Sequence, residues 1–221
     1  MAAARTGVSG KRSAAGEAAA LSPRSLTALR KAAAGCERCL LYRDATQTVF
    51  GEGPSDAPVV LIGEVPGDQE DIAGRPFVGP AGRILDRALA EAGIDRRRVY
   101  VTNAVKHFKF QLRGKRRLHK KPTADEIDRC RWWLDRELEL IAPRLAVALG
   151  VTAGRGLFGR PVTISSLRGE FVALRADMEA FVTVHPSSVL RQPDEAARQR
   201  EYQKFVSDMR AVARHVPDVR N

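Results

Sequence analysis

The sequence contains few cysteines and no long apolar run. Three cysteines among 221 residues, an odd number in a long chain, argue against a disulfide framework. They favour a reducing compartment such as the bacterial cytoplasm, or a metal site. The longest clean apolar run, 57–63, is far shorter than the roughly 18 residues that span a membrane, which excludes a membrane-spanning class. The length fits one main domain, 25–215, which we expect to be a monomer.

Acidic residues are also scarce relative to basic ones. Asp and Glu number 26 against 37 for Lys and Arg, which gives a net charge of +11. A field of this sign attracts polyanions, so DNA, RNA and acidic membrane surfaces are candidate partners. The first 24 residues hold a single acid, Glu17, among Ala, Gly, Ser and Arg. That composition is compatible with a transit peptide, but we interpret 1–24 as a disordered basic arm because Glu17 interrupts its only Ala-rich stretch.

Apolar periodicity predicts helices that alternate with strands. The expected strands are 59–62, 99–102, 145–149 and 181–184. The expected helices are 26–34, 83–92, 123–141, a short one after Gly150, and 194–212, with irregular segments at 63–82 and 103–122. This order predicts an α/β fold of three layers, α/β/α, with a mostly parallel central sheet. Ligands bind beyond the carboxyl ends of such strands, so the loops that begin at Gly63, Asn103 and His185 are the expected site.

The cysteines suggest a metal centre. Cys36 and Cys39 form a C-x-x-C spacing, which lets two thiolates reach one centre. Cys130 lies far away in sequence on the expected helix 123–141, and His107, just before that helix, is the best candidate for a fourth ligand. The alternative is a redox pair together with a buried, inert Cys130. The spacing does not separate zinc from an iron–sulfur cluster.

One stretch concentrates positive charge without any acid. Between 106 and 121 it contains Lys106, Lys109, Arg113, Lys115, Arg116, Arg117, Lys120 and Lys121. Phe108, Phe110 and two histidines are interleaved, a pattern typical of phosphate neutralisation with stacking groups. A solvated loop is the alternative, but the position after a strand favours nucleic acid. The surrounding cations are expected to lower the pKa of His119 and keep its imidazole neutral, although such a histidine is most often a phosphate contact.

Polar side chains follow the other strand ends. Glu64 and Asp68 come after strand 59–62 between glycines, and Phe77 is suited either to stack on a base or to pack in the core. Asn103 offers an amide that suits a pyrimidine edge, or a turn. His185 precedes a proline and two serine hydroxyls able to hold phosphate. Each residue alone is ambiguous, whereas their joint placement on successive strand ends favours a site.

Four motifs in order resemble those of the family 4 uracil-DNA glycosylases, which carry a [4Fe–4S] cluster. They are Gly63-Glu64-Val65-Pro66-Gly67, Gly74-Arg75-Pro76-Phe77-Val78-Gly79, Thr102-Asn103 and His185-Pro186-Ser187-Ser188. The resemblance covers about 26–212 and is greatest to the UdgX branch. That branch is marked by Asp68-Gln69-Glu70-Asp71, by a histidine at His107, and by an inserted Lys-Arg-Arg-Ile-His loop that here reads Lys115-Arg116-Arg117-Leu118-His119.

The resemblance implies a role for each matching residue. Cys36, Cys39, His107 and Cys130 would hold the cluster. The base site would comprise Glu64, Val65, Pro66, Phe77, Asn103 and His185, and the DNA contacts would be Lys115, Arg116, Arg117, Ser187, Ser188 and Arg191. Phe77 would stack on uracil, Asn103 would bind its edge and His185 would donate to its O2. Glu64 would stabilise the cationic sugar, with Asp68 as a supporting carboxylate. Val65 stands where the branch has glutamine, so a polar contact beside uracil is expected to be missing.

The expected function follows from these roles. The protein would extrude uracil, preferably from single-stranded DNA where extrusion costs less, and cleave the N-glycosidic bond. By resemblance, His119 would then attack the sugar C1′ in place of water and stay bonded to the DNA. One alternative is ordinary turnover with water as nucleophile, which releases abasic DNA. The other is a non-catalytic iron–sulfur protein that binds nucleic acid.

Overall fold

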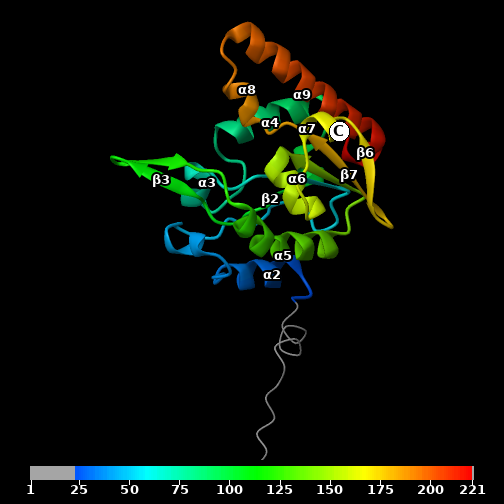
Figure 1. Ribbon diagram of the computed structural model, residues 1–221. Coiled ribbons are helices and arrows are strands. Elements are labelled where there is room, and N and C mark those ends of the chain that lie inside the picture. The colour runs from blue at the N-terminus through cyan, green and yellow to red at the C-terminus, as the bar shows by residue number, and fades with distance from the viewer. Residues whose placement is uncertain (1–22, 221) are drawn as a thin grey trace, which may run out of the picture.

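A five-stranded sheet forms the centre of the computed structural model, which describes residues 23–220 (Figure 1). Its strands, in spatial order, are β2 (Val99–Asn103), β1 (Val59–Gly63), β5 (Leu145–Leu149), β7 (Met178–Thr183) and β6 (Phe171–Arg175). The first four pair in parallel, and β6 runs antiparallel to β7 at one edge. This arrangement confirms the predicted α/β fold with a mostly parallel sheet.

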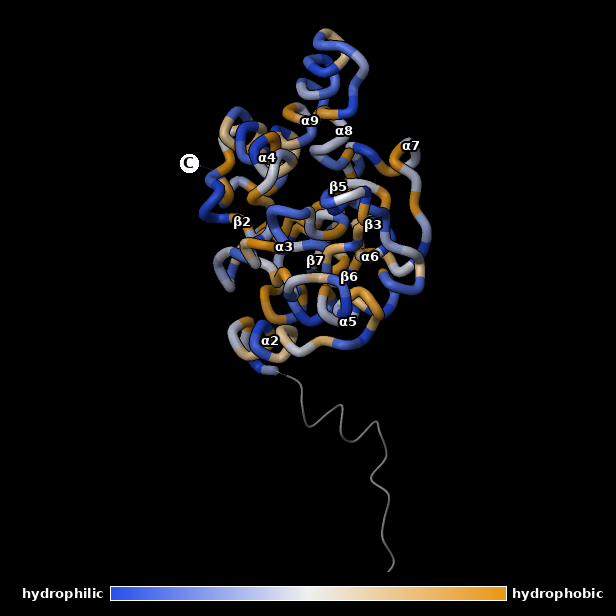
Figure 2. The backbone as a smooth tube through the Cα atoms, turned by 90° about the vertical axis from the view of Figure 1, so that its left-hand side faces the viewer, coloured by the Kyte–Doolittle hydropathy of each residue, from blue (hydrophilic) through white to orange (hydrophobic). Residues whose placement is uncertain are grey.

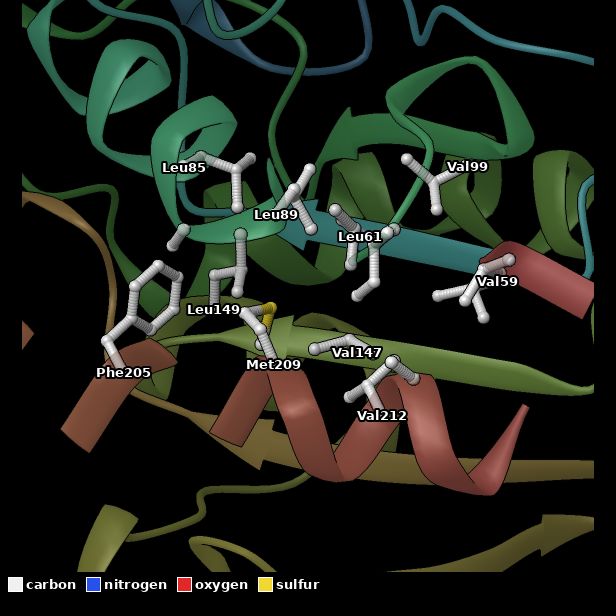
Figure 3. Close-up of a cluster of buried hydrophobic side chains, with 14 of the residues drawn as sticks. Val59, Leu61, Leu85, Leu89, Val99, Val147, Leu149, Phe205, Met209 and Val212 are labelled. Carbon is white, nitrogen blue, oxygen red and sulfur yellow. The ribbon is translucent and has the colours of Figure 1, made fainter. Parts of the chain in front are cut away.

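One face of the sheet is covered by α4 (Pro80–Glu91) and α9 (Glu195–His215). Every residue of β1, β2 and β5 is buried, as expected for strands that have helices on both faces. Figure 3 shows the apolar side chains of α4 and α9 that meet those of the sheet: Leu85, Leu89, Phe205, Met209 and Val212 against Val59, Leu61, Val99, Val147 and Leu149.

The opposite face is covered by α5 (Ala124–Ile141) and α6 (Val151–Phe158), with α2 (Leu26–Ala33) packed against α5. The Thr123 side chain accepts from the Glu126 amide and the Glu126 carboxylate accepts from the Thr123 amide, which confirms the predicted capping box at the start of α5. In Figure 2 the apolar segments gather toward the middle of the molecule. The chain therefore forms the three predicted layers.

Two segments expected to be irregular contain regular structure. Residues 63–82 include α3 (Asp68–Ala73), which has acids in its first turn and ends at Gly74 in the left-handed conformation. The basic stretch contains a hairpin of β3 (Phe110–Arg113) and β4 (Arg116–His119), joined through Gly114 at φ +60°. The many Gly and Pro residues of the first segment hid the helical pattern of α3. The many charges of the second hid the alternating pattern of the hairpin.

Other boundaries also differ from the prediction. Helix α4 begins at Pro80 rather than 83, because proline suits the first turn, and α9 continues to His215. Strand β7 begins at Met178 and ends at Thr183, two residues before His185. Edge strand β6, none of whose residues is fully buried, was missed. Short elements complete the fold: α7 (Ile164–Leu167), α8 (Ser187–Leu190), η1 (Leu40–Arg43), η2 (Arg96–Arg98) and η3 (Pro217–Val219).

Two further expectations concern the basic arm and the lack of a membrane span. Residues 1–22 of the arm lie outside the described residues. Within the described part of the chain, no helix combines the length and the apolar character needed to cross a membrane.

The parallel pairing places the carboxyl ends of β1, β2, β5 and β7 at one edge of the sheet.

Candidate active site

A cavity of about 670 Å³ lies at this carboxyl edge. Its walls come from the loops after β1, β2, β5 and β7 and from the end of β4. They include every residue predicted for base binding or catalysis, and three of the six predicted DNA contacts: Glu64, Val65, Pro66, Asp68, Phe77, Asn103, His119, His185, Ser187, Ser188 and Arg191. Lys115, Arg116 and Arg117 do not line it.

Gly63 allows the side chains at the base of the cavity to approach one another. A Cβ at this position would lie 2.6 Å from Phe77 Cζ and would clash with Asn103 Oδ1. Glu64 follows directly, and its Oε1 is buried without a hydrogen-bond partner among the described residues. An unpaired carboxylate oxygen in a cavity wall is suited to stabilise positive charge on a ligand.

Phe77 is held in a backbone conformation that side chains seldom adopt. Its φ is +57°, in the left-handed region, and the first turn of α4 packs against its carbonyl so closely that only glycine fits at position 82. Its ring lies 6.3 Å from that of His185, with 26° between the two planes. Such strain concentrates at functional sites, and Phe77 lines the cavity.

His185 is fixed in one neutral tautomer. Its Nδ1 accepts a hydrogen bond from the Ser187 amide at 3.2 Å, so the ring proton is on Nε2. Ser187 Oγ lies 2.8 Å from the same nitrogen and accepts from Arg191 Nη1 at 2.7 Å. Burial, aided by Arg191 and His119, lowers the His185 pKa to about 4. The residue is therefore a neutral Nε2–H donor at pH 7.

His119 reaches the same cavity from a different part of the chain. It ends β4, and its ring lies 6.3 Å from that of Phe108. The residue is exposed and lines the cavity, yet desolvation by the surrounding protein lowers its pKa. The Glu64 carboxylate acts in the opposite direction, and Arg191 adds to the lowering. The predicted direction is confirmed, but desolvation rather than neighbouring cations is the main cause.

Arg117 docks the hairpin onto α3. It pairs with Asp68 Oδ1 and with Asp71 Oδ2, each at 2.6 Å. Its guanidinium also lies over the rings of Phe108 and Phe110, at 5.3 and 5.2 Å from their centroids. Arg117 is thus committed to the protein rather than free for DNA. Asp68 lines the cavity but serves as a partner of Arg117.

The basic stretch therefore divides into two groups. Lys106 is fully buried against Glu137, and Lys109 pairs with Glu126 at 2.9 Å, so neither is the free phosphate contact that the pattern suggested. The exposed cations are Arg113, Lys115, Arg116, Lys120 and Lys121. They form the part of the stretch that remains available to a polyanion.

Three of the four predicted metal ligands belong to one buried apolar cluster. Cys36, Cys39 and Cys130 share the apolar cluster formed by α2, α5 and the segment between α2 and β1. Trp133 Nε1 donates to Cys36 Sγ at 3.0 Å, and the Lys106 amide donates to Cys130 Sγ at 3.2 Å. Such N–H···S bonds and apolar surroundings suit the thiolates of an iron–sulfur cluster.

His107 has a free lone pair in the same region. Thr48 Oγ1 donates its single proton to Ala33 O at 2.9 Å, so it accepts from His107 Nε2, also at 2.9 Å. The other ring nitrogen, Nδ1, is buried without a hydrogen-bond partner among the described residues. This is the tautomer that a metal-binding histidine adopts.

Among residues 23–220, no three His, Cys, Asp or Glu side chains converge as one metal ion requires. Burial raises the pKa of Cys130 to about 12 and also raises that of Cys39, so their ionisation at neutral pH requires a bound cationic centre.

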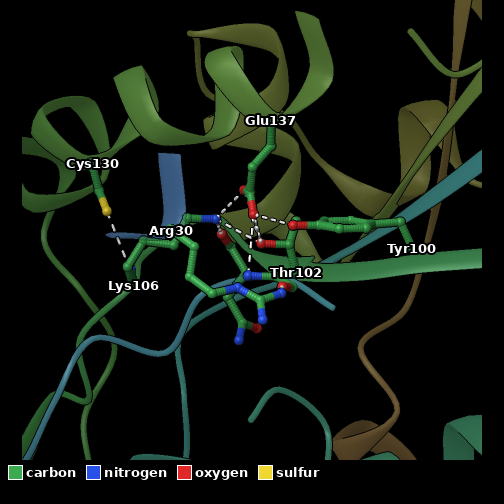
Figure 4. Close-up of polar contacts among 8 residues, drawn as sticks. Arg30, Tyr100, Thr102, Lys106, Cys130 and Glu137 are labelled. Atoms are coloured by element: carbon green, nitrogen blue, oxygen red, sulfur yellow. Dashed lines mark hydrogen bonds and ion pairs between the residues drawn. The ribbon is translucent and has the colours of Figure 1, made fainter. Parts of the chain in front are cut away.

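The sequence reasoning missed a buried polar network beside the cavity. Glu137 is fully buried and bonds to Lys106, Tyr100 and Thr102 (Figure 4). A signal was present, because Glu137 shares the apolar face of α5 with Cys130, Leu134, Leu138 and Ile141. An acid in that position requires a buried partner.

The chain matches known proteins over most of its length. The family model "Uracil DNA glycosylase superfamily" matches residues 50–210. A type-4 uracil-DNA glycosylase of Thermotoga maritima is 38% identical over 165 residues, which is 74% of this chain and 82% of that protein. One of Sulfurisphaera tokodaii is 33% identical over 178 residues, 77% of this chain and 78% of that protein. A type-5 uracil-DNA glycosylase of Pyrobaculum aerophilum is 30% identical over 151 residues, 61% of this chain and 63% of that protein. The chain belongs to the uracil DNA glycosylase superfamily.

Proposed function

We propose that this protein is a uracil-DNA glycosylase that cleaves the N-glycosidic bond of extruded uracil and captures the sugar C1′ on His119. The relatives named as type-4 uracil-DNA glycosylases support the glycosylase activity. One observation carries the capture step. The hairpin brings His119 into the same cavity as Glu64, Asn103 and His185, with its pKa lowered. A neutral imidazole is a nucleophile, whereas a protonated one is not.

Base recognition is assigned to three residues of the cavity. The Phe77 ring stacks on the uracil plane, and the Asn103 amide bonds the polar edge of the pyrimidine. His185 donates from Nε2–H to uracil O2. As the bond from C1′ to N1 breaks, the bonding electrons go to the base, and this hydrogen bond strengthens as negative charge grows on O2.

The sugar carries the complementary positive charge. Glu64, with its unpaired buried oxygen, stabilises the oxocarbenium-like sugar. A neutral ring nitrogen of His119 then donates its lone pair to C1′, and the imidazolium that forms loses its remaining ring proton to solvent. A nucleophile fixed in the cavity competes with water because it is already positioned. The product is an N-alkylated histidine, which has no easy route to hydrolysis.

Single-stranded DNA is the proposed substrate. Extrusion of a base from a duplex costs a few kcal/mol, and extrusion from a single strand costs less. The exposed cations Lys115 and Arg116 at the hairpin turn, with Arg191 at the cavity wall, are suited to phosphates along a flexible strand.

Cys36, Cys39, Cys130 and Nδ1 of His107 are assigned to a [4Fe–4S] cluster. The buried thiols and the unpaired nitrogen support this assignment. When bound, the cluster supplies a covalent cross-link between segments rather than electron transfer, since glycosidic cleavage moves no net electrons. The cluster ligands hold α5 to the loop that carries Lys106 and thereby support the wall of the cavity.

A denaturing gel tests the capture step. The wild-type chain, incubated with uracil-containing single-stranded DNA, is expected to give an SDS-resistant protein–DNA band, and His119→Ala is expected to abolish it. His215→Ala is a matched control, because His215 pairs with Glu179 at the far end of β7 and does not line the cavity. An undiminished band from His119→Ala, or none from wild type, contradicts covalent capture.

Ordinary turnover is the second candidate. The relatives bear the name of type-4 uracil-DNA glycosylases, and this function requires only that water attack C1′ instead of His119. The two candidates differ in stoichiometry. Capture yields at most one cleaved strand per protein molecule, whereas turnover yields free abasic DNA in large excess over the protein.

A further inference from the structure

Lys106 is a fully buried lysine whose three protons all meet oxygen atoms. Its Nζ donates to Thr102 Oγ1 at 2.6 Å, to the Asn103 carbonyl at 2.8 Å and to Glu137 Oε2 (Figure 4). Neither Lys106 nor Glu137 exposes any side-chain surface. The ammonium group is thus completely satisfied within the protein.

Glu137 is equally well satisfied. Its Oε1 accepts from the Tyr100 hydroxyl at 2.9 Å and from the Gly51 amide at 3.1 Å. Thr102 accepts from Lys106 and donates its own proton to Glu137. The network therefore contains no unmatched donor, and it forms a rigid unit rather than a mobile one.

A buried ion pair of this kind adds little net stability over apolar residues of similar volume. Its specific consequence here is geometric. Lys106 Nζ holds the carbonyl of Asn103 from one side, while the next two amides, Ala104 and Val105, donate to Gly63 O and Glu64 O at 2.9 and 3.1 Å. The backbone that carries the Asn103 amide is thus fixed from both directions.

Lys106 also touches the cysteine cluster through its backbone. Its amide donates to Cys130 Sγ, and its carbonyl accepts from the Val49 amide at 2.8 Å. One residue thereby joins the thiol region to the strand end that bears Asn103. A shift of Cys130 would be transmitted over a single residue to the wall of the cavity.

We propose that Lys106 is a positioning residue for base recognition, which holds the Asn103 backbone so that its amide meets the pyrimidine edge. This inference rests on the proposed glycosylase function and adds a residue that touches neither the base nor the sugar. It predicts that removal of the Nζ contact slows the release of uracil and leaves the binding of DNA unchanged.

The test uses the full-length, cluster-loaded protein and two variants of the network. Lys106→Met with Glu137→Gln removes both charges while the glutamine amide oxygen still accepts from Tyr100. Glu137→Gln alone keeps the contact from Nζ to Asn103. We expect the rate of uracil release to be about tenfold lower in the double variant than in wild type. This is the effect expected from the loss of one hydrogen bond to the base. Glu137→Gln alone is expected to be less stable yet to retain its rate within about twofold.

A double-mutant cycle with Asn103→Ala separates positioning from general damage. If Lys106 acts through Asn103, then Asn103→Ala costs much less in the double-variant background than in wild type. Additive effects of the two changes would overturn the proposal. An equal loss of uracil release in Glu137→Gln alone would also overturn it, because that variant retains the positioning contact.

Lys109→Met with Glu126→Gln is the matched control. This pair also ties the same loop to α5, but its hydrogen bond goes to Glu126, whereas the donor to the Asn103 carbonyl is Lys106. Its rate and its affinity for uracil-free single-stranded DNA are expected to stay within about twofold of wild type. A tenfold loss in this control would assign the effect to loop tethering and overturn the role of Lys106. Wild type that releases no uracil at all would refute the proposed function itself, and the inference with it.

Discussion

The basic stretch 106–121 contains two regions of similar composition and opposite environment. At its inner end, Lys106 is fully buried and Lys109 is paired with an acid of α5. At its outer end, Lys115 and Arg116 are exposed at the hairpin turn. The inner cations pair with acids of α5, whereas the outer ones remain free for phosphate. The difference shows that a run of basic residues overstates the charge available to a polyanion. The cations that pair with acids inside the protein must first be subtracted.

The largest effect is expected from loss of the innermost cation. Lys106→Met without a compensating change leaves the Glu137 carboxylate buried and unpaired, which should lower the free energy of unfolding by about 3 to 5 kcal/mol. Lys115→Met, at the exposed turn, should change it by less than about 0.5 kcal/mol. Urea denaturation of the two variants measures both values. Similar losses of unfolding free energy in the two variants would contradict the division of the stretch into buried and exposed cations.

Arg117 lies between the two regions and should give an intermediate effect. Arg117→Met leaves Asp71, which is fully buried, with only the Thr46 amide as donor, and we expect a loss of about 1 to 3 kcal/mol. The hairpin should also loosen, so its amides should exchange hydrogen faster and His119 should react more slowly with DNA. Arg116→Met is the neighbouring control, for which exchange of the hairpin amides should match wild type.

The histidines of the cavity provide a test by pH. Burial puts the pKa of His185 at about 4, below the ordinary 6.5, so the unfolded chain binds more protons between these values. Stability should therefore fall as pH drops from about 6.5 to 4, and His185→Asn should show a shallower slope. The pKa of His119 is also lowered, so adduct formation should persist below pH 6.5 and decline only at still lower pH. A decline centred at 6.5 or above would contradict the desolvation of this histidine.

The outermost cations should give the smallest structural effect and a distinct binding effect. Lys115→Gln and Arg116→Gln should leave stability unchanged but weaken DNA binding for all sequences alike. Each should reduce the slope of log affinity against log salt by about 1 if it contacts a phosphate. Titrations of uracil-free single strands at several salt concentrations measure this slope. A slope equal to that of wild type would exclude these side chains from the DNA interface.

The sequence predicted the elements that follow strong local rules. The runs at β1, β2 and β5 are continuous apolar segments, and the Thr123–Glu126 pair fixed the start of α5. Elements with mixed signals were missed. The hairpin is one such case, because one of its cations, Arg117, and the two lysines that precede it, Lys106 and Lys109, pair with acids that lie elsewhere in the chain, and no local pattern shows that pairing.

In the candidate site, too, some features could be predicted from the sequence and others could not. The polar residues after successive strand ends favoured a ligand site, and the family resemblance implied that this site binds a base. The structure brings those side chains into one cavity, where Gly63 permits their close approach. Sequence alone could not separate the predicted role of Arg117 as a DNA contact from a role in docking the hairpin, since an arginine in a basic stretch suits either purpose. Only the approach of α3 to β4 supplies Asp68 and Asp71 as its partners.

The sequence by itself determined the class of protein, through its few cysteines and its excess of positive charge. It also determined the order of strands and helices and the polar groups that follow the strands. These depend on composition and on contacts between near neighbours along the chain. Tertiary structure alone decided which cations are buried, which ring nitrogens are free, and why His119 loses affinity for a proton. Those properties depend on desolvation and on partners that are distant in sequence, and neither is defined until the layers have packed.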